Sequence, residues 1–409
     1  MDRYIEKAVS KLCWGPLGQN IATFVAALAE MGFARESVQK QLRLLSQLGR
    51  WMQRTRRAVT DLDQINSEVF LAAYRRRRRL KRGDRAALRH LIEHLQDQGV
   101  ITVRIAVPEN EQPFTKLERR YENHLLKERG LAAVTVRGYR RLVHRFLLRC
   151  FDERPLALKK LKACEVSSFI VQYTGCNSPT SSQSMVTALR SFFRFLTQEG
   201  ETHFDLGTCI PSFPCRTQTR LPKYIGDSDV EKVLRTCDRT TPVGRRDYAI
   251  LLLLARLGLR GGEVAGLHLE DVDWRSGEIR VLGKGVRDRL PLIAEVGEAL
   301  VAYLRDRPCS SSRNVFLRIN APCRHLRSST VSKVVRRALS RAGLKPPHTG
   351  AHLLRHSLAT NLLRKGASMA EIAELLRHRS AVTTEIYAKV DSLSLRALAQ
   401  RWPTMRGGR

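Results

Sequence analysis

Residues 248–267 read YAILLLLARLGLRGGEVAGL, and this stretch decides the fold of the C-terminal half of the chain. Its first twelve residues are almost all apolar, so we expect residues 248–259 to form a buried helix. The uninterrupted apolar run, residues 249–255, is far shorter than the roughly 20 residues that cross a bilayer. The helix is therefore predicted to lie in the core of a globular domain, with Arg260 directly after it.

The sequence around this helix predicts a domain of further helices and a small sheet. A capping box, Ser228-Asp-Val-Glu231, opens a helix that continues through Leu234. Two short strands, residues 278–281 and 287–292, flank Gly283-Lys284-Gly285, which is typical of a hairpin turn. Further helices are expected at residues 331–342, 352–363, 369–376 and 381–390.

The first 200 residues contain two related helical units. LAEMGF at residues 28–33 is matched by LKERGL at residues 126–131, at an offset of 98 residues. We favour duplication over a chance likeness of amphipathic helices, because later apolar positions match at nearly the same offset. The predicted domains are an N-terminal helical domain at 1–110 that duplicates the next unit, a helical domain at 115–205, a proline-containing linker at 206–224 and a C-terminal domain at 225–409.

The charge of the chain predicts a polyanionic partner. Its 72 Lys and Arg residues exceed its 39 Asp and Glu residues, which gives a net charge of +33 over 409 residues. Nucleic acid is the commonest such partner, and an anionic membrane surface or a solvated arginine-rich surface are the alternatives. A run of arginines follows Tyr74, and we favour phosphate contact for it over a solvated face. This run, the candidate DNA-binding segment, is Arg75, Arg76, Arg77, Arg78 and Arg79.

The cysteines and the start of the chain indicate the compartment. The nine cysteines are scattered, and no pair has the C-x-x-C spacing of a zinc site or redox motif. Reduced thiols are typical of a cytoplasm, and the first residues lack the apolar segment of a signal peptide. We therefore expect a cytoplasmic protein that needs no membrane, metal or cofactor.

Five short patterns in the last 150 residues supply candidate chemistry. Arginine binds phosphate in a bidentate manner, and a lysine at a turn can protonate a leaving oxygen. Residues three apart on a helix, such as His352 and Arg355, share one face. A tyrosine near cations can act as a nucleophile. The patterns are LGLRGGEVAGL at 257–267, GKG at 283–285, HLLRH at 352–356, LLRH at 375–378, and Tyr387.

In this order the patterns resemble the tyrosine recombinase (phage integrase) family, of the bacterial chromosome-dimer-resolving type and the mobile-element integrases. Three separations are typical of the chromosome-dimer-resolving group: 24 residues from Arg260 to Lys284, 26 from His352 to His378, and 9 from His378 to Tyr387. The resemblance covers about residues 117–400 and implies helical core-binding (SAM-like) units followed by a recombinase catalytic domain. It also implies a catalytic set made of Arg260, Lys284, His352, Arg355, His378 and Tyr387. Glu263 is expected to orient Arg260, and His356 matches no catalytic position.

The resemblance further implies a function and its partners. It predicts a site-specific DNA recombinase or integrase of a bacterial mobile element, associated with the nucleoid, that cuts and rejoins DNA through a 3′-phosphotyrosine. Double-stranded DNA is the expected partner, bound by a homo-tetramer or a mixed tetramer with related recombinases. A type IB topoisomerase-like enzyme is one alternative. A non-catalytic DNA-binding regulator is another, although it would need a broken catalytic set and all six positions are filled here.

Overall fold

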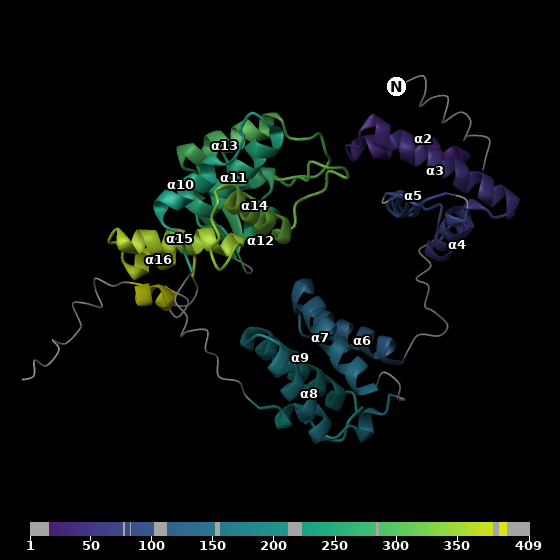
Figure 1. The fold of residues 1–409 in the computed structure, drawn as a ribbon, viewed down its shortest axis with the longest axis horizontal. Helices are drawn as coiled ribbons and strands as arrows, with labels where there is room; N and C mark the ends of the chain where they lie inside the picture. The colour runs from purple at the N-terminus through teal and green to yellow at the C-terminus, as the bar shows by residue number, and fades with distance from the viewer. Residues whose placement is uncertain are drawn as a thin grey trace, which may run out of the picture. The chain divides into compact units, whose positions relative to one another are not determined.

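The computed structural model describes residues 16–76, 78–81, 83–101, 113–151, 156–211, 223–283, 286–378 and 384–390. The described chain is mostly helical with one three-stranded sheet, as the sequence predicted (Figure 1). It divides into two compact units, one of Ile105–Arg220 and one of Met1–Arg104 with Leu221–Arg409. None of the described helices is long and apolar enough to cross a membrane.

The unit of residues 105–220 is a helical bundle with an aromatic core. Tyr121 and Phe192 are fully buried, with their rings edge to face and 5.1 Å apart. The bundle continues past residue 205, because Leu206 and Ile210 pack into its core. The predicted linker therefore begins inside the folded unit. The elements are α6 (Pro113–Asn123), η2 (His124–Glu128), α7 (Ala133–Phe151), η3 (Leu158–Lys160), α8 (Ala163–Cys176), α9 (Pro179–Gln198) and η4 (Leu206–Cys209).

The N-terminal residues form a second set of four main helices with a core of their own. Phe24, Leu45 and Leu91 are among its fully buried side chains. Each helix starts between 95 and 99 residues before its counterpart among α6–α9, close to the offset of the sequence repeat. The elements are α2 (Gly18–Glu30), α3 (Arg35–Arg54), η1 (Val59–Asp61), α4 (Gln64–Arg75) and α5 (Asp84–Asp97).

The C-terminal domain is built around α11 (Pro242–Arg256). Residues 249–255 are each at most 4% exposed, so this part of the helix is buried on all sides, as its unbroken apolar run predicted. Neighbouring helices pack around it (Figure 1). The other elements are α10 (Asp227–Arg235), α12 (Gly261–Gly266), η6 (Leu269–Asp271), β1 (Val272–Asp273), β2 (Glu278–Gly283), β3 (Val286–Pro291), α13 (Ala294–Arg305), α14 (Ser328–Arg341), α15 (Ala351–Arg364), α16 (Met369–Leu375) and η7 (Glu385–Val390).

Three details differ from the sequence prediction. The central helix ends at Arg256 rather than at residue 259, because Gly258 takes a left-handed conformation with φ +59°. The described end of the predicted helix 381–390 is the 3-10 helix η7, and residues 381–383 lie outside the described chain. The sheet is antiparallel in the order β1-β2-β3, and β1 was not expected from the sequence.

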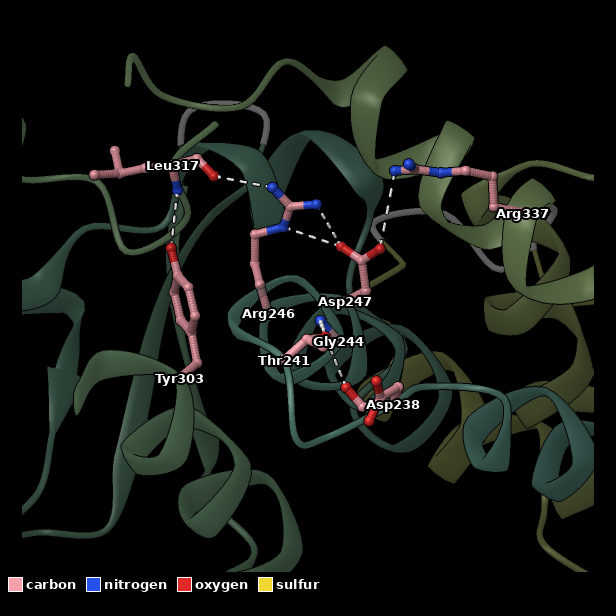
Figure 2. A network of polar contacts seen from close by, with 8 residues as sticks. All are labelled: Asp238, Thr241, Gly244, Arg246, Asp247, Tyr303, Leu317 and Arg337. Atoms are coloured by element: carbon pink, nitrogen blue, oxygen red, sulfur yellow. Dashed lines mark hydrogen bonds and ion pairs between the residues drawn. The ribbon is translucent and has the colours of Figure 1, made fainter. Parts of the chain in front are cut away.

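A buried polar network fixes the start of α11 (Figure 2). Arg246 and Asp247 are nearly inaccessible and form an ion pair of 2.6 Å. Arg246 also donates to the carbonyl of Leu317, whose N–H donates to the hydroxyl of Tyr303 on α13. Arg337 of α14 lies 3.8 Å from the second carboxylate oxygen of Asp247. The network therefore joins α11 to α13 and α14.

We predict that Asp247→Ala lowers the free energy of unfolding by about 3–5 kcal/mol, because it leaves the buried Arg246 charge without its partner. Denaturant unfolding of the purified variant measures this change. Glu278→Ala is the control, because Glu278 pairs with Arg289 at an exposed site and should contribute less than about 1 kcal/mol. Equal losses in the two variants would contradict the prediction.

Candidate active site

Arg260 is held in place by the short helix that follows it. It is the N-cap residue of α12, and both its N–H and its Nη1 donate to the carboxylate of Glu263 at 2.8 Å. The Glu263 side chain is 5% exposed, whereas that of Arg260 is 31% exposed. Glu263 therefore anchors the guanidinium on its protein side, as the sequence predicted, and the rest of Arg260 remains accessible.

Arg355 is buried and joins three helix ends. From the first turns of α15 it donates to the carbonyl of Gly258, after α11, and to that of Leu376, at the end of α16. A side chain at residue 258 would meet Leu376 at 2.7 Å, so glycine permits this close approach. Burial, with the charges of Arg260 and Arg377, lowers the pKa of Arg355 to about 10. The guanidinium nevertheless stays charged at neutral pH.

His352 lies almost one turn before Arg355 on the same helix and is exposed. Partial desolvation, together with the charges of Arg355 and Arg260, lowers the pKa of His352. The three side chains are close enough for their charges to act on one another. The imidazole is therefore neutral at neutral pH and can either donate or accept a hydrogen bond.

His378 is positioned by the way α16 ends. The N–H of Arg377 bonds to the carbonyl of Glu374, and the N–H of His378 bonds to that of Ala373, each at 2.9 Å. This pair of bonds is a Schellman motif. The ring is fixed further by a 2.8 Å hydrogen bond between its Nδ1 and the hydroxyl of Thr384. Burial, followed by the charges of Arg355 and Arg260, lowers the pKa of His378 to about 4.

Tyr387 lies in η7 and is only 1% exposed. Its ring is parallel to that of His378, 6.5 Å away, and its hydroxyl shares a 2.7 Å hydrogen bond with Nδ1 of His356. Apolar side chains of α15 and α16, such as Leu363 and Ile372, complete its surroundings. Burial raises the pKa of Tyr387 to about 12, although the charge of Arg355 opposes the shift. The phenol is therefore protonated in this structure.

Comparison with known proteins identifies the family. The sequence model of the phage integrase family matches residues 223–393, and that of its N-terminal SAM-like domain matches residues 119–200. The chain is 39% identical to y4rA of Sinorhizobium fredii, predicted to be an integrase/recombinase, over 97% of both chains. It is 34% identical to the tyrosine recombinase XerD of Listeria innocua, over 66% of this chain and 93% of XerD. The chain belongs to the phage integrase family.

This tyrosine recombinase is therefore an enzyme of site-specific DNA recombination, and solved structures share its fold. XerH bound to a palindromic difH substrate after cleavage has a TM-score of 0.54, with 23% identity over 69% of this chain and 83% of XerH. A lambda integrase tetramer bound to a Holliday junction has a TM-score of 0.52, with 18% identity over 80% of this chain and 91% of the integrase.

The structure brings most of the predicted recombinase residues together. Arg260 connects through Glu263 to Arg377, which precedes His378, and the His378 ring faces Tyr387. His352 and Arg355 come from the adjoining helix. Lys284 lies outside the described residues. No three His, Cys, Asp or Glu side chains in the described chain are grouped to bind a metal.

The described arginines of the predicted DNA-binding run lie at the end of α4 and directly after it. Arg77 is outside the described chain, and the other four arginines of the run are exposed. Arg75 and Arg76 line a shallow hollow with Arg85 of α5 and a single acidic residue, Glu68. The hollow therefore carries a net positive charge.

His356 is the residue that the sequence reasoning missed. Its Nδ1 contacts the hydroxyl of Tyr387, and the two rings lie 5.7 Å apart. One signal was present, since His356 follows His352 by four residues and so shares its helix face. The spacing does not show that Tyr387, 31 residues later, packs against that face.

We predict that recombinase stability falls as the pH is lowered from about 6.5 to about 4. Burial, ahead of nearby charges, lowers the pKa of His356 to about 4, and His378 behaves alike. The unfolded chain takes up protons below about pH 6.5, whereas the folded site resists them, so protonation favours unfolding. Melting temperatures between pH 7 and 4.5 measure the effect. His356→Gln, which does not titrate, should show a shallower decline, and an unchanged slope would contradict the assignment.

Proposed function

We propose that this recombinase cuts DNA by attack of Tyr387 on a phosphodiester bound by Arg260 and Arg355. The supporting observation is that Arg260, Arg355, His352 and His378 converge beside Tyr387. They lie at or near the ends of α11, α15 and α16. Such a cluster of fixed donors can stabilise the charge that develops on the non-bridging oxygens in the transition state.

The proposed reaction conserves the number of phosphoester bonds. The phenolic oxygen of Tyr387 forms a bond to phosphorus and loses its proton, while the 5′ oxygen of the next nucleotide leaves as a hydroxyl and takes up a proton. The product is a 3′-phosphotyrosine, and attack by a 5′ hydroxyl of the partner duplex releases the tyrosine. We assign protonation of the leaving oxygen to Lys284. Because the ester bond is conserved, the reaction needs no external energy source.

The hydroxyl of Tyr387 is covered by protein in this structure. It is buried against His356 and cannot reach a DNA phosphate from there. Attack therefore requires η7 to move, so that the hydroxyl exchanges its bond with His356 for a position in line with the phosphate. Because burial lowers the pKa of His356 to about 4, its imidazole is a weak base, so we assign it to holding the phenol rather than to activating it.

We further propose that the first 110 residues form a second DNA-clamping unit. The matched helix order of α2–α5 and α6–α9 supports a duplication, and the exposed arginines at the end of α4 supply phosphate contacts. Exchange between two duplexes needs four active sites, so the proposed assembly on DNA is a tetramer, either of this chain or mixed with related recombinases. The proposed setting is a mobile element.

Tyr387→Phe tests the central proposal. It removes only the phenolic oxygen, so the variant should fold and bind DNA like the parent yet form no covalent adduct. The assay incubates the protein with nicked candidate sites from the flanks of its own gene and detects protein–DNA adducts on denaturing gels. Adduct formation by the variant would assign the nucleophile to another residue.

A sulfur-substituted DNA gives the control for this variant. Lys284→Ala should slow cleavage by roughly 10²–10⁴-fold, the usual range for general acid help. A 5′-bridging sulfur at the scissile position should restore much of that rate, because a thiolate leaves without protonation. The same DNA should not rescue Tyr387→Phe. Rescue of Arg260→Ala as strong as that of Lys284→Ala would remove the support for Lys284 as the acid.

Replacement of the arginine run tests the second clamp. Alanine at all five positions from Arg75 to Arg79 should flatten the salt dependence of DNA binding, since each phosphate contact contributes about 0.9 to the slope of log K against log salt. Adduct formation at saturating DNA should persist, because none of the five arginines belongs to the predicted catalytic set. DNA affinity is measured between 50 and 300 mM salt for the parent and the variant. An unchanged slope of log K against log salt would mean that the arginine run is solvated and does not contact phosphate.

A further inference from the structure

Arg377 occupies a backbone position that disfavours its own residue type. It has φ +53°, and it is the residue directly after the helix cap in the Schellman motif of α16, where glycine is preferred. Arg56 is the one other non-glycine residue of the described chain with a positive φ. An arginine in this conformation carries backbone strain, so its side chain must contribute something that glycine cannot.

The side chain of Arg377 is buried within the catalytic cluster. It is 7% exposed, and its Nη2 donates to Oε2 of Glu263 at 2.7 Å. The other oxygen of the same carboxylate accepts from Arg260. Nε lies 3.7 Å from a carboxylate oxygen of Asp288, and neither Nε nor Nη1 has a hydrogen-bond partner within the described chain. Glu263 therefore bridges two guanidinium groups, one accessible and one buried.

This bridge changes the charge that a phosphate would meet. Arg260 and Glu263 alone form a pair with no net charge, and a buried carboxylate at 2.8 Å would cancel most of the field of Arg260. Arg377 returns one positive charge to the group. Asp288 offsets part of this charge, but less of it than Glu263 does, because its carboxylate is farther from the guanidinium and more exposed to solvent.

We propose that Arg377 is a positioning residue of the recombinase: by pairing with Glu263, it leaves the charge of Arg260 available to the scissile DNA phosphate. Arg377 thus acts through Glu263 and Arg260 rather than by touching DNA. The inference rests on the proposed function of the site. It explains why a strained arginine with unpartnered nitrogens is kept at this helix end.

The test combines single and double variants in a single-turnover cleavage assay at saturating DNA. Arg377→Gly relieves the backbone strain but leaves Glu263 to neutralise Arg260, so cleavage should slow at least tenfold while DNA affinity stays within about twofold. Glu263→Gln combined with Arg377→Gly removes the neutralising charge and keeps an acceptor for Arg260. The double variant should therefore cleave faster than Arg377→Gly alone.

Arg56→Gly is the matched control, because it relieves an equal φ of +53° at an exposed site and should leave the cleavage rate unchanged. Melting temperatures show whether each variant is folded under the assay conditions. Cleavage by Arg377→Gly within twofold of the parent, or a double variant no faster than Arg377→Gly, would overturn the inference while the proposed function stands. If the parent protein formed no Tyr387 adduct, the proposed function would fail and the inference with it.

Discussion

The buried guanidinium of Arg355 is the constraint on which the catalytic domain depends. Its two hydrogen bonds to the carbonyls of Gly258 and Leu376 tie the end of α11 and the end of α16 to the start of α15. Main-chain carbonyls at helix ends have no partner inside their own helix, so a planar cation with several donors satisfies two of them at once. Because these bonds hold the helix ends together, they also bring together the residues that follow each end, Arg260 and His378.

The site is therefore assembled from helix termini rather than from one helix face. Arg260 is the N-cap of α12, His352 lies in the first turn of α15, and His378 follows the last turn of α16. Side chains at such positions are fixed by backbone hydrogen bonds, whereas the helix bodies provide the apolar packing around α11. Phosphoryl transfer gains from this arrangement, since donors that are already oriented need no reorganisation during the reaction. The nucleophile differs, because Tyr387 lies on the short η7 and its hydroxyl contacts His356 through a single hydrogen bond.

The sequence predicted the helices whose apolar pattern extends over several turns. Helices α11, α14 and α15 follow from apolar periodicity, and α13 could have been found from the spacing of Val296, Leu300 and Tyr303. Strand β1 has two residues and α12 has six, which is too short for any period to be visible. The role of Arg377 could not be predicted, because its partner Glu263 lies 114 residues earlier in the chain, although the predicted helix end at residue 376 was nearly correct. The left-handed conformation of Arg377 follows from where α16 ends.

The electrostatics of the cluster bear on the proposed reaction. Burial and mutual repulsion lower the pKa of Arg355 to about 10 and that of His378 to about 4, and burial keeps the phenol of Tyr387 protonated at neutral pH. Glu263 relieves part of this repulsion between Arg260 and Arg377. A phosphate that enters the cluster adds a negative charge, which favours the protonated form of every neighbouring base. Phosphate binding is then linked to proton uptake by the histidines, and the same cations that hold the phosphate lower the cost of forming the phenolate. The arginines that repel one another in the cluster would each attract the phosphate, and this attraction would align the substrate.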